Sequence, residues 1–236
     1  MNRPIHSATV AATEWLSESM VRVVFASDAL DGMELFADSY VKLRFDGVQR
    51  AYTVRAVSPG QFAVDFVVHG DEGLAGPWAA AAKPGDSLEF VGPGGAWSPR
   101  PTASLHLFIG DESALPAIAS GLERLDGAPS LVFAEVEAPG HEYPLPTPAT
   151  WVYREGARYG ERLVEAVLAA ELPSGDLEVF LHGNAEMVRP LRRYLLGERE
   201  LAREALSASG YWRAGLTDEG WRAAKREFNA VMEAEA

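Results

Sequence analysis

Arg50, Tyr52 and Thr53 bring a guanidinium, a phenol ring and a hydroxyl together at the end of a β-rich run. A guanidinium can bind a pyrophosphate through two parallel hydrogen bonds. A tyrosine beside a hydroxyl can pack against and hydrogen-bond an isoalloxazine ring. The same residue types also suit an ordinary half-buried strand with one polar face. The motif therefore indicates a candidate flavin site and leaves the purely structural alternative open.

Two further segments carry residue types that can receive phosphate. Residues 69–73, HGDEG, follow an apolar strand and precede a helix-like run at residues 74–82, so their backbone N–H groups could bind a pyrophosphate. Residues 110–113, GDES, follow another apolar run and open a predicted helix whose first amides could face a nucleotide. The plainer alternatives are a strand-to-helix turn with a surface histidine and a capped helix start.

The elements that must position these residues fall into two regimes. Before the breaker-rich residues 92–101, short alternating segments predict a barrel or sandwich. The predicted strands are residues 20–26, 40–45, 52–57, 62–68 and 87–91. After residues 92–101, apolar runs alternate with helical patterns, and this alternation predicts a parallel sheet with crossover helices. The predicted strands there are residues 105–109, 131–136, 151–153 and 178–181, with helices around 115–125, 161–170, 188–195 and 218–233. We place the domain boundary so that the domains are residues 1–100 and 101–236.

Composition excludes several kinds of chemistry. The 236 residues include no cysteine, which excludes disulfides, iron–sulfur ligation and thiolate zinc sites and leaves redox chemistry to a bound organic cofactor. A formal net charge of −13 disfavours nucleic acid and anionic lipid as partners. No apolar stretch approaches the roughly 20 residues that cross a bilayer, and no apolar segment follows the N-terminus. We therefore expect a cytoplasmic monomer with no membrane span.

Taken in order along almost the whole chain, these segments resemble the siderophore-interacting protein family, whose members are FAD-dependent ferric-siderophore reductases. The matching segments are residues 50–55, 65–73, 78–79, 83–86, 92–95, 110–118, 189–195 and 210–215. The resemblance implies a ferredoxin-reductase-like fold. Its first domain would be a six-stranded antiparallel β-barrel that binds FAD. Its second would be a half-Rossmann parallel α/β domain that binds NADPH or NADH and carries a C-terminal helical extension.

The resemblance also implies which residues contact the cofactors. Those expected to contact FAD are Arg50, Tyr52, Thr53, Asp65, His69, Gly73, Trp78 and Ala79. Those expected to contact NAD(P)H or to line the flavin cleft are Gly110, Asp111, Ser113, Ala114, Asn184, Tyr211, Trp212 and Arg213. The last three belong to a cluster that we expect in a loop, where adjacent aromatic residues often serve as packing anchors. No catalytic acid or base and no metal ligand is expected, because electrons would move through the flavin.

The chain departs from the family pattern at three positions. Gly76 stands where a serine or threonine is usual, Ser113 replaces a threonine, and Asn184 replaces a glutamate. The glycine removes an expected phosphate donor, and the asparagine puts a neutral amide beside the expected nicotinamide position. We expect the glycine to affect how tightly FAD binds and the asparagine to affect the affinity or preference for the nicotinamide nucleotide.

The helix predicted at residues 218–233 resembles the C-terminal extension typical of the NADPH-using branch of the family, but the preference for NADPH or NADH stays open at this point. Glu135 and Glu137 follow the second predicted strand of the α/β domain and would repel a ribose 2′-phosphate. Arg154 and Arg158 follow the third strand and could receive one.

The reaction implied is hydride transfer from the nicotinamide to flavin N5, followed by single-electron reduction of Fe(III) held in a siderophore, which releases Fe(II) to the cytoplasm. A hydroxamate chelate of low charge would suit this acidic chain better than an anionic catecholate. Two alternatives stay open. One is another NAD(P)H-dependent flavin reductase on the same scaffold, and the other is a non-catalytic family member that binds a metallophore.

Overall fold

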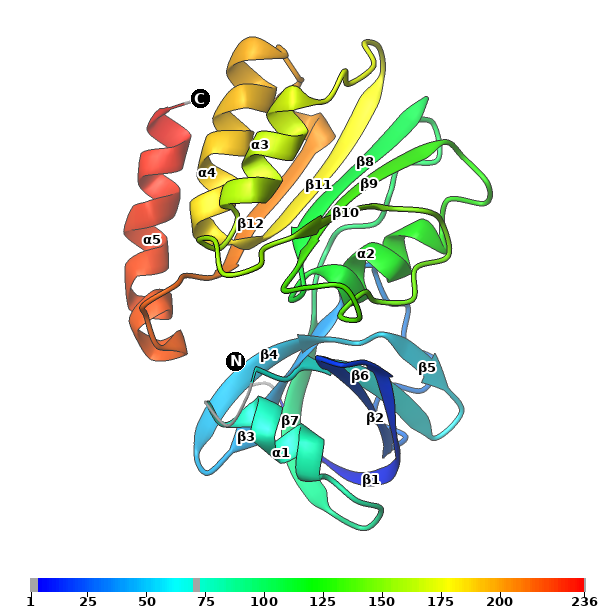
Figure 1. Cartoon of the computed structure of the whole chain (residues 1–236). Helices are drawn as coiled ribbons and strands as arrows, with labels where there is room; N and C mark the ends of the chain where they lie inside the picture. The colour runs from blue at the N-terminus through cyan, green and yellow to red at the C-terminus, as the bar shows by residue number, and fades with distance from the viewer. Residues whose placement is uncertain (1–3, 70–72, 236) are drawn as a thin grey trace. The chain divides into compact units, whose positions relative to one another are not determined.

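The structure is a computed structural model that describes residues 4–69 and 73–235. The chain divides into two compact units (Figure 1). The first comprises the described residues up to Ser98 together with Ala119–Arg124, and the second comprises Pro99–Ile118 and the described residues from Leu125 onward. The grouping of residues 119–124 with the first unit was not predicted from the sequence.

The first unit is built on a seven-stranded antiparallel sheet with the strand order β4-β3-β7-β1-β2-β6-β5. Its elements are β1 (Ile5–Ser17), β2 (Met20–Ala26), β3 (Tyr40–Phe45), β4 (Val48–Thr53), β5 (Ala56–Ser58), β6 (Gln61–Val67), α1 (Ala75–Ala81) and β7 (Ser87–Gly94). Alternate residues of β3, namely Val41, Leu43 and Phe45, are buried in the core. The antiparallel β architecture is confirmed, with seven strands in place of six and with β4 and β5 at the two ends of the hydrogen-bonded order.

The single strand predicted at residues 52–57 is divided between two strands in the structure. The amide of Val54 donates to the carbonyl of Ser39 at 2.7 Å, whereas the amide of Arg55 donates to the carbonyl of Ala63 at 2.8 Å. The chain thus changes its pairing partner between two consecutive residues. The predicted strand at 52–57 is therefore divided into the end of β4 and the whole of β5.

The second unit is a five-stranded parallel sheet with the order β10-β9-β8-β11-β12 and helices on both faces (Figure 1). Its strands are β8 (Leu105–Asp111), β9 (Ser130–Val136), β10 (Thr150–Tyr153), β11 (Leu177–Asn184) and β12 (Leu206–Trp212). Its helices are the first half of α2 (Leu115–Leu122), whose last residues are grouped with the first unit, and α3 (Glu161–Ala169), α4 (Ala185–Arg193) and α5 (Asp218–Ala234). Short helical turns lie at Tyr194–Glu198 and Arg203–Ala205. The predicted parallel α/β fold is confirmed.

Strand alternation decides which helices cover each face of this sheet. Leu107 and Ile109 pack with α3 and α4 in one core cluster. Gly110 points to the other face, where a Cβ atom would lie 2.7 Å from the Cβ of Ala114 at the start of α2. The glycine thus lets α2 approach the sheet closely.

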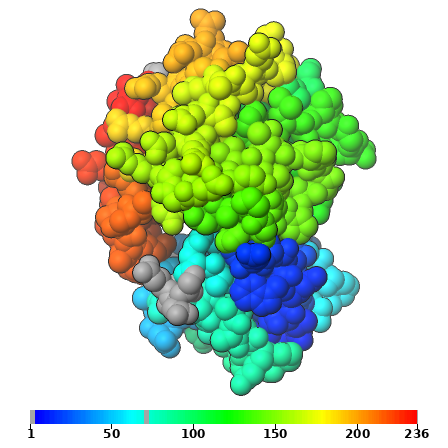
Figure 2. Space-filling view, in the orientation of Figure 1, coloured from blue at the N-terminus to red at the C-terminus, as the bar shows by residue number. Residues whose placement is uncertain are grey.

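The C-terminal helix α5 lies at the surface beside α4 (Figures 1 and 2). Trp221 and Met232 are its buried residues, and most of its other side chains are half-buried or exposed. The hydroxyl of Thr217 caps its N-terminus by accepting a hydrogen bond from the amide of Gly220 at 3.1 Å. Within the described residues, no helix is long and apolar enough to span a membrane.

Candidate functional site

The predicted flavin motif lies on β4. Arg50 and Tyr52 are two residues apart and so share a face of the strand, and Thr53 is its last residue. The Tyr52 ring packs against Phe66 with 4.4 Å between ring centroids, and the Arg50 guanidinium donates to the carbonyl of Gln49 at 3.1 Å. All three motif side chains are half-buried. A guanidinium, a phenol and a hydroxyl that are anchored yet partly accessible fit the phosphates and ring of a flavin dinucleotide.

Three other residues predicted to contact FAD contribute to the interior of this unit. Both carboxylate oxygens of Asp65 accept hydrogen bonds from Arg22 at 2.7 Å, and the Asp65 side chain is fully buried. The Trp78 ring lies parallel to Phe25 at 6.2 Å, and Ala79 is buried. These contacts stabilise the sheet and its helix, and a flavin contact by these residues stays a prediction.

The predicted pyrophosphate loop is described only at its ends. Residues 70–72 lie outside the described residues, while His69 is exposed and Gly73 has a φ of 81° that favours glycine. A Cβ atom on Gly76 would lie 3.0 Å from the carbonyl oxygen of Val67. A side chain at this position would make a tight contact with the backbone, which the glycine avoids.

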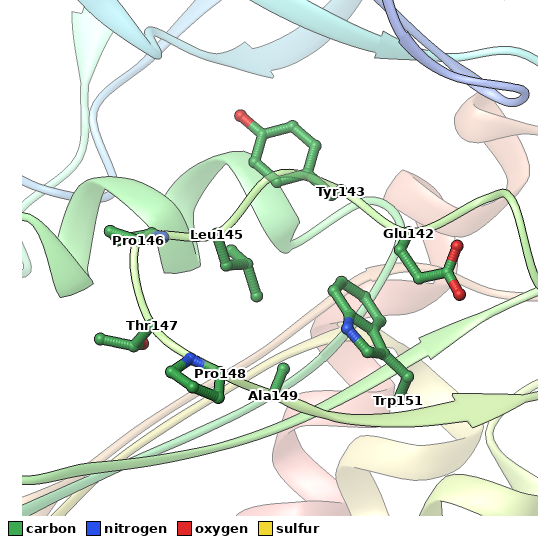
Figure 3. A pocket seen from close by; sticks show the side chains of 8 residues that line it. All are labelled: Glu142, Tyr143, Leu145, Pro146, Thr147, Pro148, Ala149 and Trp151. Carbon is green, nitrogen blue, oxygen red and sulfur yellow. The ribbon is translucent and has the colours of Figure 1, made fainter.

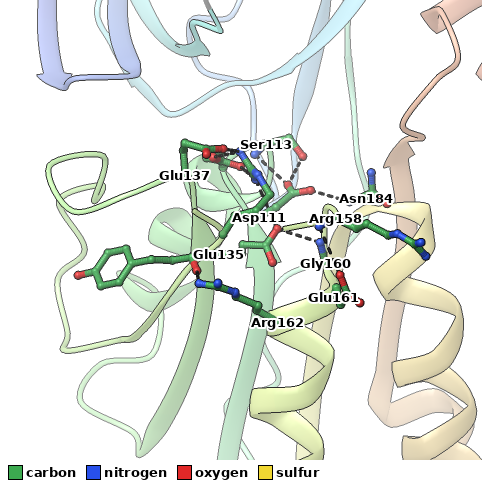
Figure 4. A network of polar contacts seen from close by, with 12 residues as sticks. Asp111, Ser113, Glu135, Glu137, Arg158, Gly160, Glu161, Arg162 and Asn184 are labelled. Atoms are coloured by element: carbon green, nitrogen blue, oxygen red, sulfur yellow. Dashed lines mark hydrogen bonds and ion pairs between the residues drawn. The ribbon is translucent and has the colours of Figure 1, made fainter. Parts of the chain in front are cut away.

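In the α/β unit, the carboxylate of Asp111 joins the ends of three strands. Its Oδ1 accepts from the amide and the hydroxyl of Ser113 at 3.0 and 2.5 Å. Its Oδ2 accepts from the amide of Asn184 at 2.7 Å and from the indole of Trp212 at 2.9 Å. Burial raises the pKa of Asp111, although these hydrogen bonds oppose the rise. The structure thus brings four predicted nucleotide contacts together at the carboxyl edge of the sheet (Figure 4).

Asn184 carries a donor that has no partner. Its Oδ1 accepts from the amide of Glu186 at 2.8 Å and so caps α4, but its Nδ2 is buried without a hydrogen-bond partner among the described residues. Ligands of open α/β sheets bind outside the carboxyl ends of the strands. An unsatisfied amide at this edge fits a ligand that brings an acceptor, as a nicotinamide nucleotide does.

Tyr211 and Arg213, which were also predicted to contact the nucleotide or line the flavin cleft, interact with other side chains of this unit. Residues 211 and 212 end β12, so their expected position in a loop was wrong. The Tyr211 hydroxyl lies 2.9 Å from Nδ1 of His182, whose Nε2 lies 2.9 Å from the Ser207 hydroxyl. Burial, helped by the charge of Lys225, lowers the pKa of His182 to about 3, so this ring is neutral. Arg213 donates to Glu186 at 2.6 Å, and its role toward a nucleotide stays a prediction.

A buried cluster of charged side chains around Arg154 was not predicted from the sequence. The guanidinium lies 3.3 Å from a carboxylate oxygen of Glu112 and 3.4 Å from one of Glu135, and it also pairs with Glu137. It stacks over the ring of Tyr159, 4.1 Å from the centroid. The Arg154 side chain is 3% exposed, so it is not free to receive a phosphate, contrary to expectation.

The charges of this cluster perturb one another. Burial and the nearby Asp111 raise the pKa of Glu112 to about 7, against the effect of Arg154. Burial also raises the pKa of Glu135. Burial alone would lower the pKa of Arg154, but the neighbouring Glu112 and Glu137 raise it. The cluster therefore keeps Arg154 charged and favours a proton on its buried carboxyl groups.

A shallow hollow lies in the segment between β9 and β10 (Figure 3). Its volume is about 370 Å³, and its lining includes Glu142, Tyr143, Leu145, Thr147 and Trp151. The lining contains no cationic side chain, so it does not match an anionic group. Among the described residues, no group of three or more His, Cys, Asp or Glu side chains could hold a metal ion.

Family models match both units of the chain. The model described as "Siderophore-interacting FAD-binding domain" matches residues 45–97, which include the motif on β4. The model described as "Siderophore-interacting protein" matches residues 103–215, which include the carboxyl edge of the parallel sheet.

Individual proteins resemble the chain over nearly its full length. An uncharacterised protein of Mycobacterium tuberculosis is 40% identical, covering 99% of this chain and 98% of its own. The ferric vibriobactin reductase ViuB of Vibrio cholerae is 31% identical, covering 92% of this chain and 83% of its own. The crystal structure of a siderophore utilization protein from T. fusca superimposes with a TM-score of 0.80 at 31% identity, covering 91% of this chain and 95% of that one.

Proposed function

The chain belongs to the siderophore-interacting protein family, and on that premise we propose that it is an FAD-dependent NAD(P)H:ferric-siderophore oxidoreductase, a monomer acting in the cytoplasm. Bound FAD would supply the change from two-electron hydride chemistry to one-electron reduction of Fe(III). The protein's own residues would bind and orient the cofactor, the donor and the ferric chelate. Reduction to Fe(II) would release the iron, because hard oxygen chelators hold Fe(II) far less tightly.

One observation carries the flavin part of this proposal. The segment on β4 that lies inside the FAD-binding match has a half-buried Arg50, Tyr52 and Thr53. Arg50 would bind the FAD pyrophosphate, Tyr52 would pack against the flavin on the side away from Phe66, and Thr53 would donate to the ring.

The donor would bind at the carboxyl edge of the parallel sheet. There the Asp111 carboxylate holds Ser113, Asn184 and Trp212 in fixed positions through the hydrogen bonds it accepts. Asn184 is fully buried, so its Nδ2, which has no hydrogen-bond partner among the described residues, would donate to the nucleotide after a small local movement of this edge. Removal of that donor is expected to weaken nucleotide binding without removing FAD.

Titration of the purified full chain with FAD, followed by quenching of flavin fluorescence, tests the flavin site. We expect Arg50→Gln to weaken FAD binding by about tenfold or more, the factor that one hydrogen bond to a charged group supplies. Arg44→Gln is the matched control, because Arg44 lies on the neighbouring strand β3 and pairs with Glu89 at 2.7 Å. A wild-type chain that does not bind FAD, or equal losses in the two variants, would count against this assignment.

A further inference from the structure

Charged side chains follow the second and third strands of the α/β unit, and their arrangement bears on the ribose of the donor. In parallel α/β dinucleotide domains, a carboxylate after the second strand accepts a hydrogen bond from the ribose 2′-hydroxyl of NADH, whereas a nearby arginine receives the 2′-phosphate of NADPH. Here Glu137 follows β9 and Arg154 follows β10. Which of these two groups is accessible decides which donor fits.

Arg154 is the inaccessible one. Its side chain is 3% exposed, and Glu112, Glu135 and Glu137 surround its guanidinium. A phosphate could reach it only by displacing these partners, and it would then face the carboxylates that it had displaced. One cation among three carboxylates is a poor receptor for a dianion.

Glu137 is the accessible one, with a side chain that is 41% exposed. One of its oxygens pairs with Arg154, and the other accepts from the amide of Gly156 at 3.3 Å. These contacts fix the carboxylate at the surface just beyond the strand end. A carboxylate oxygen has more than one lone pair, so Glu137 can still accept a hydrogen bond from a ribose hydroxyl.

Glu135, the other carboxylate near the end of β9, is not an alternative receptor for the ribose. Glu135 is fully buried, and its Oε1 accepts from the amide of Gly160 at 2.9 Å. Its Oε2 is buried and has no hydrogen-bond partner in the part of the chain that the structure describes. Because this carboxyl group is fully buried, it lies out of reach of a ribose, and Glu137 is the accessible acceptor after β9.

The other arginines after β10 do not supply a phosphate site beside Glu137. Arg162 donates to the carbonyl of Tyr153 and to Glu155, both at 2.8 Å. The Arg158 side chain extends away from Glu137 in Figure 4.

We propose that the α/β unit selects NADH over NADPH and that Glu137 determines this specificity by accepting a hydrogen bond from the ribose 2′-hydroxyl. The proposal rests on the proposed function, because it concerns the donor of that reaction. The proposal adds which nucleotide is the donor and which residue recognises its ribose.

Calorimetric titration of the FAD-reconstituted full chain with ADP-ribose and with its 2′-phosphorylated form tests the proposal without any redox turnover. We expect ADP-ribose to bind at least tenfold more tightly. Glu137→Gln should reduce this ratio by about tenfold, since it removes one charged acceptor and its repulsion. Glu165→Gln is the matched control, because Glu165 is an exposed glutamate on α3 and its removal leaves the partners of Arg154 and Arg162 in place. That control should leave the ratio unchanged.

Tighter binding of the phosphorylated form by the wild-type chain would overturn the proposal, whatever the variants do. So would a ratio that Glu137→Gln leaves unchanged, or a failure of both ligands to bind. The proposed function is judged separately by the FAD titration. A chain that binds no FAD would contradict the proposed reductase, and its preference for ADP-ribose would then be measured without FAD. A bound flavin that NADPH reduces faster than NADH would contradict only the proposed choice of donor.

Discussion

Replacing Glu112 with glutamine should change how the stability of the α/β unit depends on pH. Burial, together with the charge of Asp111, raises the pKa of Glu112 from 4.5 to about 7 in the folded chain. A carboxyl group whose pKa rises on folding takes up a proton between these two values. The cost of burying its charge is therefore absent below pH 4.5, develops as the pH rises, and is complete above pH 7.

The size of the effect follows from that difference in pKa. From 4.5 to about 7, at about 1.4 kcal/mol per pH unit, the buried charge costs about 3 kcal/mol above pH 7. Glutamine has nearly the same shape and does not ionise, so it avoids this cost. The variant should therefore gain about 3 kcal/mol relative to the wild-type chain when the pH is raised from 4 to 8.

Urea unfolding of both chains at pH 4 and pH 8, followed by circular dichroism, measures this change. Glu142→Gln serves as a control of opposite sign. The hydroxyl of Tyr153 donates to Glu142 and lowers its pKa, so the wild-type residue stabilises the chain at high pH and loses that effect as the pH falls through its folded pKa. A difference between Glu112→Gln and the wild-type chain that does not grow with pH would refute the reasoning.

Three further predictions follow from the geometry and the charge. Gly160→Ala should cost about 2–4 kcal/mol in urea unfolding, because a Cβ there would lie 2.5 Å from the Cβ of Met187 at a φ of 78°. Gly156→Ala, at a φ of 80° with no described atom within 4 Å, should cost only about 1–2 kcal/mol, and equal losses would contradict the predicted clash. His182 should stay neutral at pH 5 in ¹⁵N NMR spectra, because its pKa is about 3, and it should stabilise the fold above pH 6.5 and lose that contribution as the pH falls toward 3. A midpoint near pH 6.5 would show that the ring is not buried as described. A hydroxamate chelate of low charge should be reduced faster than an anionic catecholate by a chain with a net charge of −13, and equal or faster catecholate turnover would argue the other way.

The architecture could be predicted where burial imposes a clear period on the sequence. In β3 the buried Val41, Leu43 and Phe45 alternate with half-buried polar residues. β11 is buried along its whole length, and its residues 179–181 form a short apolar run. In β1 only Ala8 and Val10 are buried, so no alternation revealed that strand. β12 was missed because it too shows no alternation: most of its residues are half-buried.

The candidate site was predictable residue by residue but not as an arrangement. Asp111, Ser113 and Asn184 were each expected near the nucleotide, yet the bonds that join them link residues up to 73 positions apart. The cluster around Arg154 gave even less signal, because three glutamates in two separate segments look like solvated charges in a sequence. Only the fold brings them to one buried guanidinium.

The most direct test of the proposed reductase is the visible absorption spectrum of the purified chain, supplied with FAD if needed, under anaerobic conditions. Addition of NADH or NADPH should bleach the flavin bands, and a ferric siderophore added afterwards should restore them as Fe(II) appears in the presence of a ferrous chelator. A chain that takes up no FAD would contradict the proposed function. So would flavin bands that neither donor bleaches, or that the ferric siderophore does not restore.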